Sequence, residues 1–154
     1  MLICPKIRKR NRRLTDFPAR FIDQLADKFS YAIGMIPLKL NKEQPGYILN
    51  TLLIPWFRAA LQLVATGVSD PATVDLCWEL DTGATPDQTP FRKLDKVGLP
   101  LALHIMGMQP GADDPDSVAG QIVALLKGYV DAGKTGIAVG EGFYRYDAEG
   151  NVVK

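Results

Sequence analysis

The stretch from Pro45 to Gly67, PGYILNTLLIPWFRAALQLVATG, most constrains the fold, because it predicts one long helix that is apolar on most sides. At 100° per residue its polar side chains gather in one narrow stripe that would face solvent. That stripe consists of Thr51, Arg58, Gln62 and Thr66. Proline and glycine at positions 45 and 46 suit the entry into the helix, and Pro55 inside it predicts a kink. We therefore expect a kinked and mostly buried helix.

Asn50 does not belong to this polar stripe. It projects among Tyr47, Ile54, Phe57 and Leu61, where a buried amide without a partner would cost roughly 1–3 kcal/mol. One interpretation is a core asparagine that is paired with a neighbouring carbonyl or a buried water. The other is an amide that faces a cleft and holds a ligand or another polar side chain. The pattern alone leaves both interpretations open.

Length and composition suit one globular domain with a real core, at 154 residues, 47% apolar and 23% charged. No apolar run reaches the length of a membrane span and the N-terminus has no apolar signal-peptide core, so we expect a cytoplasmic protein without a membrane partner. Residues 1–16 concentrate basic side chains without an apolar period, which predicts a disordered basic arm. Residues 21–154 carry 11 basic and 16 acidic side chains, which argues against nucleic acid as a partner of the domain.

The remaining chain predicts further helices and no convincing sheet. A helix is expected from about Pro18 to Ile33, followed by a short extended segment at residues 35–40. Helix starts are predicted at three pairs of a capping residue and a proline, Asp70–Pro71, Thr89–Pro90 and Asp114–Pro115. A break near residues 98–100 and a stop at Gly133 complete the pattern. The sequence thus predicts an all-α domain.

Two candidate sites fail on inspection. Residues 128–135, GYVDAGKT, match the string G-x-x-x-x-G-K-[ST], but a helix runs into them where the phosphate-binding loop requires a strand. His104 is the single histidine and has no metal-ligand partner at helical spacing, so we interpret it as an ordinary helix histidine. Cys4 and Cys77 have neither metal-binding nor redox spacing.

Three ordered motifs resemble one family. Residues 45–53, PGYILNTLL, resemble the P-G-F-I-x-N-R-L-L signature that opens the C-terminal domain of L-3-hydroxyacyl-CoA dehydrogenases, including the bacterial 3-hydroxybutyryl-CoA enzymes. Residues 90–99, PFRKLDKVGL, and residues 140–146, GEGFYRY, are similar to that family's G-P-F-x-L-x-D-x-V-G-L and G-x-G-F-Y-x-Y. The resemblance covers about residues 21–154, with residues 21–40 similar to the end of the family's nucleotide-binding domain.

The resemblance implies a helical bundle like the C-terminal domain of 6-phosphogluconate dehydrogenase, which in this family forms the dimer interface and closes over acyl-CoA. The implied reaction is reversible hydride transfer between NAD and the 3-hydroxyl carbon of a 3-hydroxyacyl-CoA, giving a 3-oxoacyl-CoA in fatty-acid metabolism. The expected organisation is a basic arm at residues 1–16, a helix and link at residues 17–44, and the C-terminal-like helical domain at residues 45–154.

The signature asparagine lies beside the substrate and near the catalytic histidine in this family, and it corresponds to Asn50, which is therefore the candidate catalytic residue. Four positions depart from the family pattern: Thr51 stands in place of an arginine, Thr89 in place of a glycine, and Asp87 and Gln88 differ from the usual loop. The glycine-rich nucleotide loop and the catalytic histidine and glutamate belong to an upstream domain that we expect this chain to lack, and His104 cannot replace them.

We therefore expect a substrate-side and dimerisation domain, with acyl-CoA, a second copy of itself and a separate nucleotide-binding domain as partners. NAD is implied only by the family, and the chain by itself is expected to be inactive, because an asparagine supplies neither a general base nor a hydride carrier. We further expect the chain to be the C-terminal part of such an enzyme, with the first 16 residues or so unrelated to it. The competing hypothesis is a catalytically silent, self-associating helical remnant.

Overall fold

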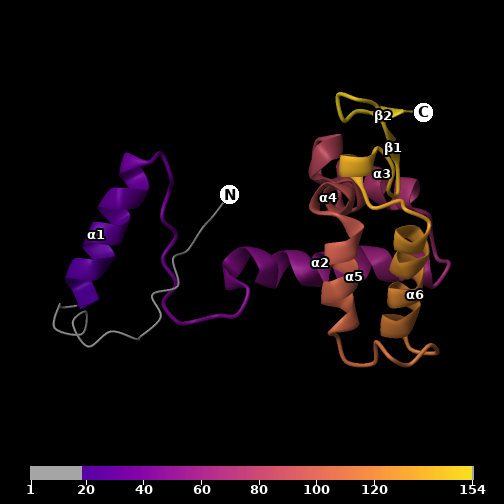
Figure 1. The fold of residues 1–154 in the computed structure, drawn as a ribbon, viewed down its shortest axis with the longest axis horizontal. Helices are drawn as coiled ribbons and strands as arrows, with labels where there is room; N and C mark the ends of the chain where they lie inside the picture. The colour runs from indigo at the N-terminus through magenta and orange to yellow at the C-terminus, as the bar shows by residue number, and fades with distance from the viewer. Residues whose placement is uncertain (1–18, 154) are drawn as a thin grey trace. The chain divides into compact units, whose positions relative to one another are not determined.

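The computed structural model describes the backbone of residues 19–153 and the side chains of residues 23–153, so the predicted basic arm lies outside the described residues. The chain divides into two compact units at the junction of Gln44 and Pro45. Figure 1 shows their elements in the order of the chain.

In the described residues of the first unit, 19–44, there is one helix, α1 (Ala19–Ala32). Gly34, with φ of 76°, follows its end, and the amide of Met35 donates to the Ser30 carbonyl at 2.9 Å. A salt bridge of 2.6 Å joins Lys39 to Asp27 of the helix. Residues 35–40 form neither helix nor strand. The predicted helix is confirmed to within a residue or so at each end.

The second unit contains the other five α-helices of the described chain and its one small sheet (Figure 1). Its elements are α2 (Tyr47–Ala65), α3 (Pro71–Thr82), the 3-10 turn η1 (Pro86–Gln88), α4 (Pro90–Val97), α5 (Leu99–Gly107), α6 (Val118–Asp131), the 3-10 turn η2 (Ile137–Val139), β1 (Arg145–Tyr146) and β2 (Val152–Val153). β1 and β2 pair antiparallel, with Arg145 opposite Val153. The expected all-α domain is confirmed.

The core of this unit lies where α2, α4, α5 and α6 meet. Its fully buried apolar side chains, with relative exposure of at most 1%, are Leu61, Phe91, Leu94, Leu99, Ile122 and Leu126. α5 and α6 pack against each other most extensively, and α6 also lies along α2. The helices therefore bury their apolar stripes against one another, which is the arrangement that stabilises a helical domain.

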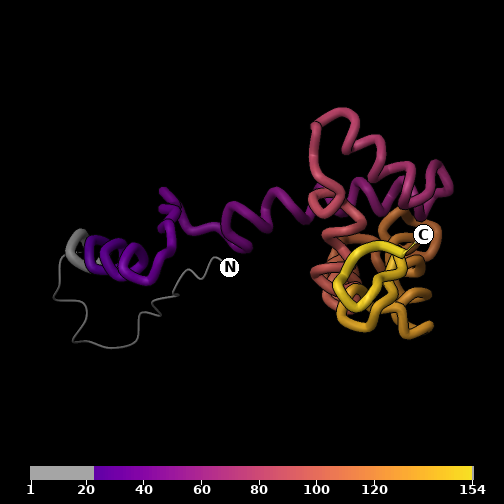
Figure 2. The backbone as a smooth tube through the Cα atoms, turned by 90° about the horizontal axis from the view of Figure 1, so that it is seen from above, coloured from indigo at the N-terminus to yellow at the C-terminus, as the bar shows by residue number. Residues whose placement is uncertain are grey.

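The long helix α2 exists as predicted but is far more exposed than expected. Only Phe57, Ala60 and Leu61 are buried in it. The tube in Figure 2 shows its first turns reaching beyond α4 and α5, and side chains there such as Leu52 remain 67% exposed. The helix has the length and mean hydropathy of a membrane span, but its second half packs in the core. The expectation of a mostly buried helix was wrong because only one face of its C-terminal half meets other helices.

Two of the three predicted helix starts are confirmed, and the third is wrong. α3 begins after Asp70, whose side chain accepts from the Thr73 amide, and α4 begins at the proline after Thr89. The third helix, α6, is capped by Ser117, which accepts from the Gly120 amide at 2.9 Å. Asp114 and the proline after it lie instead in the preceding turn, because the chain there folds back against the first turn of α6.

The rejection of the phosphate-loop string at residues 128–135 agrees with the structure. α6 runs into this segment and ends at Asp131, and Gly133 follows with φ of 76°. The amine of Lys134 forms a 3.0 Å salt bridge with Glu141. The glycine therefore terminates a helix, and the lysine is engaged with a carboxylate.

Two glycines of α6 give a matched test of this packing. A Cβ at Gly120 would lie 1.9 Å from the carbonyl oxygen of Asp114, so Gly120→Ala must displace the turn and should lower the free energy of unfolding by about 1–3 kcal/mol. A Cβ at Gly128 meets nothing within 4 Å, so Gly128→Ala should raise it by up to about 1 kcal/mol through helix propensity. Urea unfolding followed by far-UV circular dichroism measures both. Equal effects of the two substitutions would show that the turn does not pack on α6.

Candidate functional site

Asn50 lies in the exposed first half of α2. Its backbone amide donates to the Gly46 carbonyl at 3.2 Å, and its side chain makes no hydrogen bond with the described part of the chain. The interpretation of a buried core asparagine is therefore wrong, because the amide is open to solvent. The side chain is free to meet a molecule that approaches the start of the helix.

The entry into α2 is conformationally unusual. Gly46 has φ of 79°, and Tyr47 is the one non-glycine residue of the described chain with a positive φ, at 53°. A bulky side chain in this region is a rare and strained conformation that costs on the order of 1–3 kcal/mol. A Cβ at Gly46 would also come within 3.2 Å of the Asn50 Cβ. The turn that precedes Asn50 is thus tightly defined and requires glycine at position 46.

A buried carboxylate, Asp75 of α3, fixes the loop between α3 and α4. Its Oδ1 accepts from the Phe91 amide at 3.0 Å, and its Oδ2 accepts from the hydroxyl of Tyr144 at 2.9 Å. The hydroxyl of Thr89 lies 2.7 Å from the same Oδ2 and 2.7 Å from the Pro86 carbonyl. Thr89, which departs from the family glycine, is fully buried. Its hydroxyl thus serves the carboxylate, and it does not cap α4 with its side chain.

A second buried carboxylate, Asp95 of α4, holds the segment that precedes the small sheet. It accepts from the backbone amides of Phe143 and Tyr144 at 2.9 and 3.0 Å and from the hydroxyl of Tyr146 at 2.8 Å. Gly142 allows this close approach, because a Cβ there would lie 2.1 Å from Oδ1 of Asp95. The C-terminal segment is therefore fastened to α4 through its backbone and one side chain.

Burial dominates the electrostatics of this cluster. Desolvation raises the pKa of Asp95 above its ordinary value and outweighs the three hydrogen bonds, which lower it, while the nearby charge of Asp75 raises it further. Burial and the adjacent carboxylates also raise the pKa values of Tyr144 and Tyr146. The guanidinium carbon of Arg92 lies 5.3 Å from the ring centre of Tyr144. Both tyrosines therefore remain protonated donors at neutral pH.

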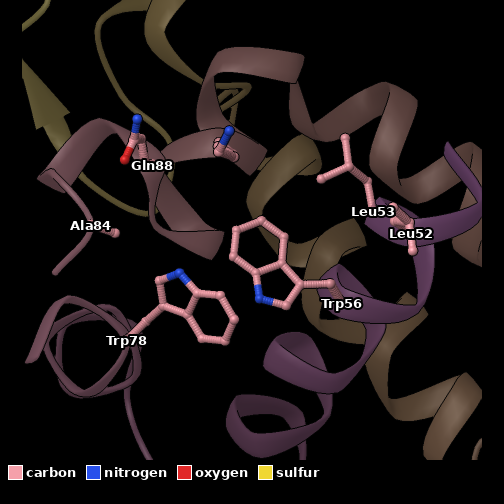
Figure 3. Close-up of a pocket in the computed structure, with 7 residues that line it drawn as sticks. Leu52, Leu53, Trp56, Trp78, Ala84 and Gln88 are labelled. Atoms are coloured by element: carbon pink, nitrogen blue, oxygen red, sulfur yellow. The ribbon is translucent and has the colours of Figure 1, made fainter. Parts of the chain in front are cut away.

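A groove of about 480 Å³ opens between α2 and α3 and is closed at one end by η1 and α4 (Figure 3). It is lined by Leu52, Leu53, Trp56, Trp78, Ala84, Gln88 and Lys93. The two indole rings meet with centroids 5.1 Å apart and planes tilted by 55°. Asp75 positions the wall of the groove that Trp78 and Gln88 form. Trp78 follows Asp75 by one turn of α3, and the η1 loop that carries Gln88 leads directly into Thr89 and Phe91, which donate hydrogen bonds to the Asp75 carboxylate.

The other chemically capable side chains do not assemble into a site. His104 is exposed on α5, as an ordinary helix histidine. Cys77 is free and exposed, and Cys4 lies outside the described residues. Among residues 23–153 no group of three or more histidine, cysteine or acidic side chains could hold a metal ion. The acidic pair of Asp75 and Asp95 is fully engaged in hydrogen bonds.

Comparison with known proteins places this domain in one family. The family model described as 3-hydroxyacyl-CoA dehydrogenase, C-terminal domain, matches residues 46–146. The fold and the match define the class of the domain, the all-helical C-terminal domain of an oxidoreductase. The chain belongs to the 3-hydroxyacyl-CoA dehydrogenase family, as its motifs predict.

Two curated relatives and one solved structure show the extent of the likeness. A probable 3-hydroxyacyl-CoA dehydrogenase of Caenorhabditis elegans is 39% identical over 105 residues, which are 68% of this chain and 33% of the relative. A probable 3-hydroxybutyryl-CoA dehydrogenase of Deinococcus radiodurans is 33% identical over 139 residues, 89% of this chain and 46% of the relative. A diketoreductase structure, described for catalysis on dicarbonyl compounds, is 42% identical with a TM-score of 0.73 and covers 82% of this chain and 42% of its own. The chain thus spans less than half the length of these relatives.

The raised pKa of Asp95 predicts an unusual dependence of stability on pH. An acid with a raised pKa in the folded state stabilises the fold fully below its unfolded-state pKa, and this contribution is lost as the pH rises through the folded-state pKa. The Asp95→Asn variant cannot titrate at this position. The stability advantage of the native chain over Asp95→Asn should therefore shrink as the pH rises above the ordinary aspartate pKa of about 4.

Asp147 provides the opposite control. Hydrogen bonds from the Asn151 amide lower the pKa of this exposed carboxyl group, so its contribution is present above the unfolded-state pKa and is lost as the pH falls. The difference between the native chain and Asp147→Asn should instead shrink in urea titrations as the pH falls below the ordinary aspartate pKa of about 4. Parallel profiles for the two variants would mean that burial does not control the ionisation of Asp95.

Proposed function

We propose that this chain is the substrate-side and dimerisation domain of an NAD-dependent 3-hydroxyacyl-CoA dehydrogenase, acting on acyl-CoA substrates in fatty-acid metabolism in the cytoplasm. The family membership supports the reaction class. The observation that carries the proposal is the exposed amide of Asn50, presented on a strained and tightly defined helix entry. Backbone strain of this kind is concentrated at functional sites.

In this proposal Asn50 is the catalytic-site contact of the domain. A carboxamide N–H can donate a hydrogen bond to the substrate oxygen that changes between hydroxyl and carbonyl. Such a donor, held in place before the reaction, favours the transition state and fixes the orientation of the reacting carbon. An asparagine side chain does not titrate, so the proton acceptor would come from another domain.

NAD would supply the hydride acceptor when it is bound to such a domain. The described residues do not fit this cofactor by themselves. The strands of their one sheet are two residues long, and no strand there leads through a glycine-rich loop into a helix. The proposed partner is therefore a nucleotide-binding domain, and this chain would contribute substrate contacts and closure of the site.

The exposed apolar face of α2 supports the dimerisation part of the proposal. Ile48 and Leu63 are 47% and 38% exposed and lie on the side of the helix opposite to Phe57 and Leu61. An apolar stripe of this kind on the surface of a domain is typical of an interface. A second copy of this chain, contributing the same helix about a two-fold axis, would cover both stripes at once.

The substrate role of Asn50 can be tested by complementation. The full chain is mixed with a separately expressed nucleotide-binding domain of a family member, and NADH formation from 3-hydroxybutyryl-CoA is followed. We expect activity that Asn50→Ala lowers by about 100-fold or more, the loss typical of a transition-state donor. Gln62→Ala, which removes an exposed amide from the same helix, should leave it unchanged. A silent remnant would neither bind acyl-CoA in calorimetry nor restore activity.

The dimer can be tested by sedimentation at micromolar concentration. The full chain should sediment as a dimer. Ile48→Glu should raise the dissociation constant more than about 10-fold, because an unpaired charge would be buried in the interface. Gln62→Glu adds the same charge to the polar stripe and should leave the dimer intact. A monomeric native chain, or equal weakening by both variants, would exclude this face of α2 as the interface.

A further inference from the structure

The groove between α2 and α3 presents hydrogen-bond donors without partners. The indole N–H groups of Trp56 and Trp78 donate to no described residue. The side chain of Gln88 uses its oxygen to accept from the Thr85 amide at 3.3 Å, which leaves its amide N–H groups free. Lys93 adds an ammonium group. Four of the seven lining side chains therefore offer donors, and the one side-chain acceptor is already engaged.

The charge of the groove is positive. Lys93 is half-buried and forms none of the salt bridges of the described residues, which involve other cations. The nearest acid of the loop, Asp87, is exposed and accepts a hydrogen bond from the Thr85 hydroxyl, and the positive charge of Lys93 acts on it only at longer range. No acidic side chain lines the groove. An anionic acceptor would therefore satisfy groups that the chain itself leaves unpaired.

The remaining walls are apolar and aromatic. Leu52 and Leu53 of α2 face Ala84 across the groove (Figure 3). The 55° tilt between the two indole planes and their 5.1 Å separation leave no slot between the rings. Trp78, however, is 37% exposed, and its open ring surface is available for stacking by another aromatic ring. A flat group can thus lie on the indole with its polar end near the ammonium group.

We propose that this groove binds a planar aromatic carboxylate, with the ring on Trp78 and the carboxylate on the Lys93 ammonium and the Gln88 amide. Asn50 precedes Leu53 by one turn, so a ligand in the groove lies about 5 Å farther along α2 than the amide. The binding of this ligand does not rest on the proposed function.

The two tryptophans of the chain, Trp56 and Trp78, are both in the groove, so its two indole N–H resonances report on this site alone. The experiment titrates 2-naphthoate into the ¹⁵N-labelled full chain and follows both signals. We expect saturable shifts with a dissociation constant of about 1 mM, the affinity of a ligand of this size at an ordinary binding efficiency. The neutral isostere 2-naphthamide should bind about 5-fold more weakly or not at all.

Lys93→Gln tests the charge, and Lys96→Gln is its matched control. Both substitutions remove one ammonium group from α4, but Lys96 does not line the groove. We expect Lys93→Gln to reduce the affinity for 2-naphthoate about 5-fold and to make it equal to that for 2-naphthamide, while Lys96→Gln changes neither. Far-UV circular dichroism confirms that each variant is folded. Equal affinities of the native chain for the two probes, or equal effects of the two variants, would overturn the proposal.

Two further outcomes would replace the proposed aromatic carboxylate with another occupant of the groove. If adenosine monophosphate shifts the indole signals at lower concentration than 2-naphthoate does, the occupant is a nucleotide. If the signals move with protein concentration and ignore every probe, a second copy of the chain covers the groove. Neither result depends on the complementation assay. Failure of the groove inference is therefore distinguishable from failure of the proposed dehydrogenase function.

Discussion

The structure of the second unit depends on two buried carboxylates that form no salt bridge with any described residue. Asp75 and Asp95 are 4% and 2% exposed, and each is satisfied by backbone amides and tyrosine hydroxyls. Burying such a group is costly unless every lone pair finds a donor. The donors come from the loop before α4 and from residues 143–146, so both segments must adopt one conformation. The buried carboxylates thus cost folding free energy, but their hydrogen bonds hold the two loops in one conformation.

This arrangement reaches the candidate site through α3 and η1. The Asp75 carboxylate fixes the point at which the η1 loop joins α4. Trp78 belongs to α3, before this loop, and Lys93 belongs to α4, after it. The near wall of the groove belongs to α2, which is held only by its C-terminal half. The wall of the groove formed by α3 and η1 is therefore held by hydrogen bonds. The wall formed by α2 belongs to a helix whose first turns expose apolar side chains to solvent.

The sequence predicts the helices well because their signals are local. Asp70 and Gly133 act within a turn of the helix that they delimit, and capping and glycine rules apply there without tertiary context. The burial of α2 was not predictable, since an apolar helix has the same periodicity whether or not another surface covers it. The third predicted helix start was wrong because Ser117, and not Asp114, caps the helix. The Asp114 carbonyl packs closely against Gly120 in the first turn of α6, so Asp114 lies in the turn before the helix.

The candidate site was predictable only in part. Asn50 was identified because it interrupts an apolar face and because the family signature contains it. The roles of Asp75 and Asp95 were hidden, although both lie in or beside the recognisable motifs, because their partners are up to 69 positions apart in the chain. The groove donors were equally hidden, because periodicity indicates which way a side chain points but not which of its polar atoms remains unpaired.

The position of Tyr144 and Tyr146 has a consequence for synthesis on the ribosome. The six α-helices of residues 19–153 all precede these two tyrosines in the chain, yet the two carboxylates on α3 and α4 obtain several of their donors only from residues 143–146. Until residues 143–146 have been made and have emerged, collapse of the helices would bury Asp75 and Asp95 without those partners. The helices must therefore wait in a loosely packed, hydrated state. The final locking of the domain therefore follows the synthesis of residues 143–146, and the packing of the helices becomes rigid only after these residues have joined them.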